Sequence, residues 1–123
     1  MAFRLLVIDD EPIVRDTLLR LLQADGYEVL TAESATDAFA LLQDGQFDLV
    51  ITDYCMRGMN GAELAAAIKE RDPNQRVLMI TAFGDRVKGL PKGVDILLCK
   101  PFSINALRGA MAPLLPPVGQ GSD

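Results

Sequence analysis

Five short apolar runs recur along the chain, and segments with helical periodicity separate most of them. The runs occupy residues 3–8, 27–32, 47–52, 76–81 and 94–99. Most are apolar nearly throughout rather than alternating, which is typical of strands that are covered on both faces. Each run therefore predicts a buried strand of a parallel sheet.

Residues that favour the first turn of a helix lie between these apolar runs and after the last one. Pro12 suits the first turn of a helix, and three polar residues are placed as N-caps, namely Ser34, Asn60 and Ser103. The segment GDRVKGLPKGVD (84–95) is the exception, because Gly89, Pro91 and Gly93 oppose a long helix. We expect the fourth helix to be short or absent.

Strand–helix alternation predicts an α/β domain with helices on both faces of a parallel sheet. Right-handed crossovers leave few topologies. The simplest is a flavodoxin-like doubly wound sheet of five strands in the order 2-1-3-4-5. We assign residues 1–116 to this domain and expect 117–123, rich in proline and glycine, to be a disordered tail.

The composition of the chain argues against binding to nucleic acids or membranes. The chain has 123 residues, which suits one domain, and its net charge of −5 with no basic cluster argues against nucleic-acid binding. No apolar run approaches the length of a membrane helix, and the N-terminus lacks a cleavable signal. We therefore expect a cytoplasmic protein that does not bind membranes.

The content of histidine and cysteine excludes several chemistries. The chain contains no histidine, which rules out Ser-His-Asp catalysis and the usual zinc sites. Any phosphohistidine must come from a partner. Cys55 and Cys99 lack metal-ligand spacing, and we expect both thiols to stay reduced.

Polar residues follow the predicted strands. Asp9 and Asp10 follow the first strand, Asp53 follows the third, and Thr81 and Lys100 close the last two. Since ligands of such sheets sit at the carboxyl ends of the strands, these side chains are expected to converge. Glu11 precedes a proline, and we expect it to point away and serve the positive end of the first helix.

This set of groups predicts a metal and a phosphoryl group. Neighbouring carboxylates destabilise each other's ionised forms, and Mg²⁺, which prefers oxygen ligands, reverses that cost. Lys100 supplies a positive charge for a phosphoryl oxygen and Thr81 a hydroxyl donor. Asp53 is left as the nucleophile, because a carboxylate can become an acyl phosphate.

The motifs LLVIDDEP, LVITDYCMRGMNG, LMITAFG and LLCKPF are together highly specific. Over roughly residues 4–115 the chain resembles the receiver domain of bacterial two-component response regulators. The resemblance implies that Asp53 accepts a phosphoryl group from a histidine kinase or a histidine phosphotransfer protein. It implies Mg²⁺ bound by Asp10, Asp53 and the main-chain carbonyl of Cys55, with Asp9 completing the acid pair. Thr81 matches the switch hydroxyl and Lys100 the lysine of the motif.

Two residues depart from the family pattern. Arg57 stands where receivers often have proline, and Leu97 stands where they usually have tyrosine or phenylalanine. With the shortened segment 84–93, Leu97 implies a switch that does not use a rotating aromatic residue. We expect a monomer or a weak dimer.

A phosphatase and a redox carrier are the two alternatives to a switch. An aspartate-nucleophile phosphatase acting on an external substrate would show a second acid two residues after an N-terminal nucleophile, and a cap domain. A flavodoxin-like redox carrier would have a loop rich in Ser, Thr and Gly after the first strand, where this chain has three acids. We therefore expect a phosphorylation-dependent switch rather than an enzyme.

Overall fold

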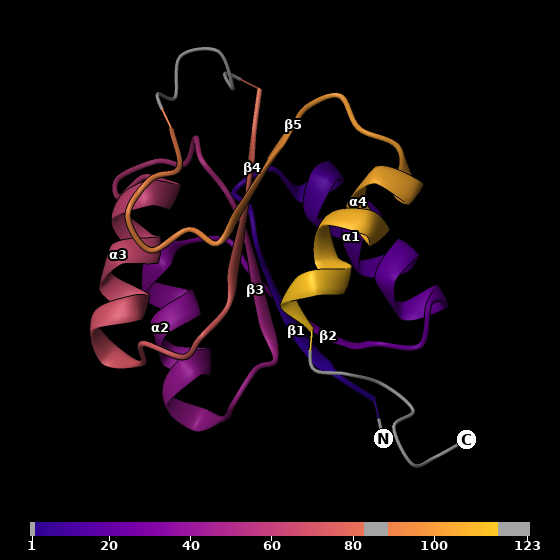
Figure 1. Cartoon of the computed structure of the whole chain (residues 1–123). Helices are drawn as coiled ribbons and strands as arrows, with labels where there is room; N and C mark the ends of the chain where they lie inside the picture. The colour runs from indigo at the N-terminus through magenta and orange to yellow at the C-terminus, as the bar shows by residue number, and fades with distance from the viewer. Residues whose placement is uncertain (1, 83–88, 116–123) are drawn as a thin grey trace.

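The computed structural model describes residues 2–82 and 89–115. In these residues five parallel strands form one sheet in the order β2-β1-β3-β4-β5, so the predicted fold class is confirmed (Figure 1). The strands are β1 (Arg4–Ile8), β2 (Glu28–Ala32), β3 (Leu49–Asp53), β4 (Val77–Thr81) and β5 (Ile96–Cys99).

Helices cover both faces of the sheet. They are α1 (Pro12–Ala24), α2 (Ala35–Asp44), α3 (Gly61–Arg71) and α4 (Ile104–Met111), with a 3₁₀ turn, η1 (Ala112–Leu114), after α4. In Figure 1, α1 and α4 lie on one face, and α2 and α3 lie on the other. The Ser34, Asn60 and Ser103 side chains each accept a backbone N–H three residues on, as the sequence predicts for N-caps.

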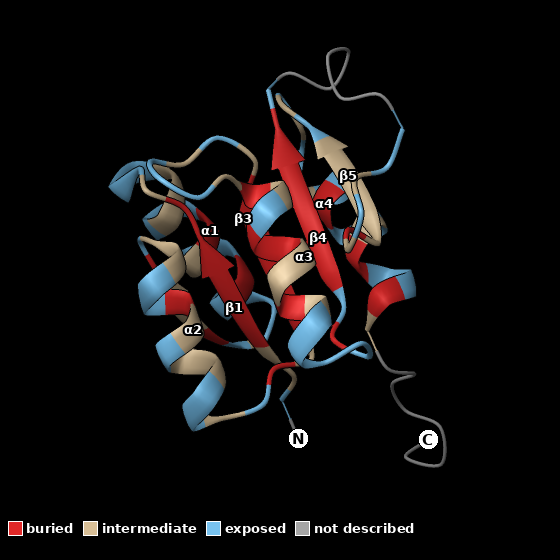
Figure 2. Ribbon diagram, turned by 90° about the vertical axis from the view of Figure 1, so that its left-hand side faces the viewer, coloured by how far each residue is buried: buried red, intermediate tan, exposed pale blue. Residues whose placement is uncertain are grey.

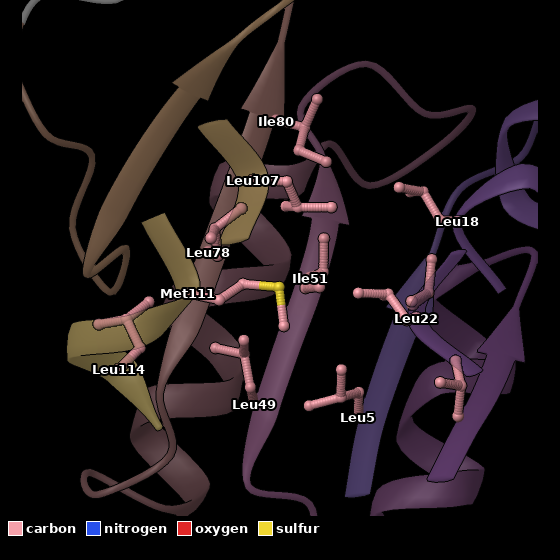
Figure 3. Close-up of a cluster of buried hydrophobic side chains, with 12 residues drawn as sticks. Leu5, Leu18, Leu22, Leu49, Ile51, Leu78, Ile80, Leu107, Met111 and Leu114 are labelled. Atoms are coloured by element: carbon pink, nitrogen blue, oxygen red, sulfur yellow. The ribbon is translucent and has the colours of Figure 1, made fainter. Parts of the chain in front are cut away.

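Two hydrophobic cores hold the helices to the sheet. Leu5, Ile51 and Leu78 project toward α1 and α4, where they meet Leu22 and Leu107 (Figure 3). The alternate strand positions form the second core against α2 and α3, which includes Leu6, Val50, Leu64, Ile68 and Met79. Strands β1 and β4 are therefore buried almost throughout, whereas the edge strand β5 is only partly buried (Figure 2).

The connection between β4 and β5 departs from the strand–helix pattern. Residues 89–95 form no helix, in agreement with the short or absent helix expected there. Gly93 has a φ of +88°, and a Cβ at this position would lie 2.7 Å from the carbonyl oxygen of Ala65 on α3. The backbone thus packs directly on α3, which only glycine permits.

Asp95 fixes the same connection. Its Oδ2 accepts hydrogen bonds from Lys69 Nζ at 2.9 Å and from the N–H of Val77 at 2.8 Å. The remainder of the expected short helix (84–88) and the expected tail (117–123) lie outside the described residues. Where the structure describes the chain, no helix is both long and apolar enough to span a bilayer.

Candidate functional site

The carboxyl ends of the central strands bring the predicted site residues to one edge of the sheet. Leu49 and Ile51 face the core under α1 and α4, and Asp53, two residues on, continues the same alternation. Asp53 pairs in register with Ile80, so Thr81 lies one residue further along the neighbouring strand. The Lys100 N–H donates to the Thr81 carbonyl at 2.7 Å, which places Lys100 next to Thr81.

Asp53 is nearly enclosed, with 5% of its surface exposed. Its Oδ1 accepts the N–H of Tyr54 at 3.0 Å and lies 3.5 Å from Lys100 Nζ. A buried carboxylate thus has an ammonium group as its neighbour, as expected from the sequence. Thr81, at the end of β4, is fully buried.

Three carboxyl groups cluster at this edge. Oxygens of Asp9, Glu11 and Asp53 all lie within 4.8 Å of one another, and Asp9 is buried. The expectation that Glu11 points away from the acids is therefore wrong. Asp9 Oδ1 accepts the Glu11 N–H at 2.9 Å, and this local turn brings the Glu11 side chain back toward the strand ends. An Asp that can bond the backbone two residues on is a known turn signal, so the sequence contained the clue.

Asp10 is not part of that cluster, although its sequence position predicted convergence with Asp9 and Asp53. Its Oδ2 accepts the main-chain N–H of Arg57 at 3.1 Å. Arg57 belongs to the loop between β3 and α3, 47 positions away along the chain. The acid next to Asp9 is therefore hydrogen-bonded to the loop between β3 and α3.

Burial and crowding of like charges disfavour ionised acids here. Burial raises the pKa of Asp9 to about 6; the Glu11 N–H opposes the rise, and the charge of Asp53 adds to it. Burial also raises the pKa of Asp53, against the lowering effect of Lys100 and the Tyr54 N–H. Mg²⁺ prefers hard oxygen ligands, and its positive charge would offset the repulsion among these carboxylates. The residues therefore fit that ion.

The loop after Asp53 is tightly constrained at its end. The Gly61 N–H donates to the Tyr54 carbonyl at 2.8 Å. A Cβ on Gly61 would lie 2.9 Å from Tyr54 Cα and would also overlap the Asp53 carbonyl oxygen. Within the same loop Cys55 is exposed, and Cys99 on β5 is exposed too; both are free thiols.

Known proteins are similar to this chain in sequence and in fold. The response regulator MprA of Mycobacterium sp. strain KMS is 34% identical over 118 residues, which cover 94% of this chain and 51% of MprA. The chain thus spans about half the length of that curated relative.

Solved structures match over nearly the whole chain. Response regulator TrrA from Thermotoga maritima, in complex with Mg²⁺-BeF, superposes with a TM-score of 0.86 at 34% identity, covering 94% of this chain and 100% of TrrA. TrrA in complex with the histidine kinase ThkA matches with a TM-score of 0.84 at 33% identity, over 94% of this chain and 100% of that chain. The family profile of the response regulator receiver domain matches residues 5–112. The chain belongs to the response regulator receiver domain family.

Proposed function

We propose that Asp53 accepts a phosphoryl group and that its phosphorylation switches the conformation of this domain. The observation that carries the proposal is the buried Asp53 carboxylate with Lys100 Nζ at 3.5 Å, beside the carboxyl groups of Asp9 and Glu11. We assign these groups the roles of nucleophile, of cation for the phosphoryl oxygens and of oxygen ligands, and their proximity supports that assignment.

The transfer step starts from a phosphohistidine of a partner, because this chain contains no histidine. An Asp53 carboxylate oxygen attacks phosphorus, the P–N bond breaks, and the imidazole nitrogen leaves with the bonding electron pair. The product on this chain is an aspartyl phosphate. Lys100 stays close enough to neutralise one of the phosphoryl oxygens in the product and in the transition state.

The metal ligands we propose are Asp9, Asp10, Asp53 and the Cys55 carbonyl, and Glu11 joins them on the strength of its place in the cluster. Bound Mg²⁺ would supply positive charge to offset that of the carboxylates and of the phosphoryl group. Thr81 is the proposed switch residue, because its hydroxyl sits on the strand next to Asp53.

For the partner we propose a histidine kinase or a histidine phosphotransfer protein. The structure of TrrA with the kinase ThkA, whose receiver chain is 33% identical to this one, supports this choice. The net charge of −5 supports a protein rather than a nucleic acid as the direct partner of the domain. We further propose that the domain acts as a switch in the cytoplasm and has no external substrate.

Incubation with acetyl phosphate and Mg²⁺, followed by intact mass spectrometry, tests the proposal. The wild type should gain the mass of one phosphoryl group, and Asp53→Asn should gain none. Asp44→Asn is the matched control, because Asp44 is an exposed residue at the end of α2. Labelling of Asp53→Asn at the wild-type level would contradict the assignment.

A further inference from the structure

The hydrogen bond between Asp10 and Arg57 connects the two loops that border the acid cluster. Asp10 lies in the loop before α1, and Arg57 lies in the loop before α3. The donor is the main-chain N–H of Arg57 and the acceptor is Asp10 Oδ2, 3.1 Å apart. Every residue type except proline offers this donor, so the contact depends on Arg57 not being proline rather than on its charge.

The same contact accounts for the position of Asp10 outside the cluster. Asp9, Glu11 and Asp53 bring oxygens within 4.8 Å of one another, and Asp10, although adjacent in sequence to two of them, is not in this group. Asp10 is still close enough for its negative charge to raise the pKa of Asp53. The Asp10 carboxylate thus acts on Asp53 through its charge while its Oδ2 is hydrogen-bonded to the loop before α3.

We infer that the Arg57 main-chain N–H is a latch that holds Asp10 away from the metal ligands, so that Asp10 reaches Mg²⁺ only after this hydrogen bond breaks. The inference rests on the proposed function, since it takes Asp10 as a ligand of the ion. Arg57 is in this view a positioning residue that acts through Asp10.

The latch has two consequences. It weakens Mg²⁺ binding, because the free energy of the hydrogen bond must be given up when Asp10 joins the site. It also couples metal binding to the loop after β3, because that loop loses its tie to Asp10 when the ion is bound. The bond is exposed to solvent, so its net contribution is modest, equivalent to about a fivefold change in affinity.

The test compares Arg57→Pro with Arg57→Ala in titrations with MgCl₂ alone, followed by calorimetry or by tyrosine fluorescence. Both variants remove the guanidinium charge, but only proline removes the N–H. Arg57 has a negative φ, the sign that proline requires. Arg57→Pro should bind Mg²⁺ about fivefold more tightly than Arg57→Ala. In an Asp10→Ala background the two variants should bind with equal affinity.

Equal affinities for the two single variants, weaker binding by Arg57→Pro, or a difference that persists without Asp10 would each overturn the latch. Circular dichroism establishes whether Arg57→Pro folds. If it does not, nuclear magnetic resonance of the wild type decides: the Arg57 amide should shift and exchange faster with solvent at saturating Mg²⁺. An amide unchanged in both respects would overturn the latch.

These outcomes are separable from failure of the proposed function. A wild type that is labelled on Asp53 and binds Mg²⁺, with equal affinities for Arg57→Pro and Arg57→Ala, would overturn the latch alone. A wild type with no saturable Mg²⁺ binding would overturn both.

Discussion

At the scale of single residues, the site contains acidic side chains that are buried and therefore poorly hydrated. Asp9 is 2% exposed and Asp53 is 5% exposed, and both have raised pKa values caused first by burial. Lys100 offsets part of this cost at Asp53. In the absence of a bound cation, ionisation of these two residues therefore reduces the stability of the fold.

The protonation of Asp9 gives a pH-dependent prediction. Its folded pKa of about 6 lies above its ordinary value of 3.8, so the folded state binds the proton more tightly than the unfolded state. This contribution to stability is complete below about pH 3.8 and is lost as the pH rises through about 6. Asp9→Asn retains an oxygen that can accept the Glu11 N–H but cannot ionise.

In urea unfolding with a chelator, Asp9→Asn should be more stable than the wild type by about 1–3 kcal/mol at pH 8 and nearly equal to it at pH 4. Asp44→Asn serves as the exposed control and should show no such trend. A difference between Asp9→Asn and the wild type that did not change with pH would refute the explanation from burial.

Glu11 offers a second test at this scale. Because its carboxyl group lies in the cluster with Asp9 and Asp53, Glu11→Gln should weaken Mg²⁺ binding several-fold by removing one negative charge. Glu70→Gln is the matched control, an exposed glutamate on α3. Titration of both variants with Mg²⁺ by calorimetry decides the matter, and equal affinities would show that Glu11 does not assist the ion.

At the scale of elements, the loop between β3 and α3 is the part most closely adapted to the site. Tyr54 N–H donates to Asp53 at its start, and the Asn60–Glu63 capping box fixes the beginning of α3 at its end. The sequence predicts Asn60 as the N-cap of this helix, and the structure adds the reciprocal bond from Glu63. The sequence did not predict the bond from the Arg57 amide to Asp10, because every non-proline residue carries that donor and only the backbone path determines its partner.

Substitution of Gly61 tests how closely the loop between β3 and α3 is packed. Gly61→Ala would place a methyl group 2.9 Å from Tyr54 Cα and against the Asp53 carbonyl, so the loop must shift. We expect a loss of about 1–3 kcal/mol in the free energy of unfolding and slower phosphorylation of Asp53 by acetyl phosphate.

Gly109→Ala is the control, because a Cβ there meets nothing within 4 Å. It lies within α4, where alanine favours the helix, and it should stabilise the fold by about 0.5–1 kcal/mol without altering phosphorylation. A Gly61→Ala protein as stable and as readily phosphorylated as the wild type would show that the loop has room to spare.

At the scale of the whole molecule, the sheet order and both helix layers could be predicted, because the apolar runs are buried on two faces and the crossovers are right-handed. The convergence of Asp9, Asp53 and Lys100 followed from the same topology. The positions of Asp10 and Glu11 did not, because they depend on a local turn at Asp9 and on a contact across 47 positions. Topology thus determines which residues meet, while the loops determine how they are oriented.

The edge of the sheet at β5 gives a prediction about assembly. Leu97 packs against the core under α2 and α3, and residues 89–95 form no helix beside it. We expect the protein to sediment as a monomer or weak dimer both with and without Mg²⁺ and beryllofluoride, a phosphoryl mimic. A strong dimer that forms only with the mimic and has Leu97 and α4 at its interface would contradict this expectation.

Borohydride reduction of the phosphorylated protein identifies the residue that carries the phosphoryl group. Borohydride converts an aspartyl phosphate to homoserine, which sequencing by tandem mass spectrometry locates. Trypsin releases residues 21–57 as one peptide, because no lysine or arginine interrupts them before Arg57. We expect homoserine at position 53 alone, and none in protein that received no phosphoryl donor. Homoserine at another aspartate, or none at all in protein that carries the phosphoryl mass, would contradict it.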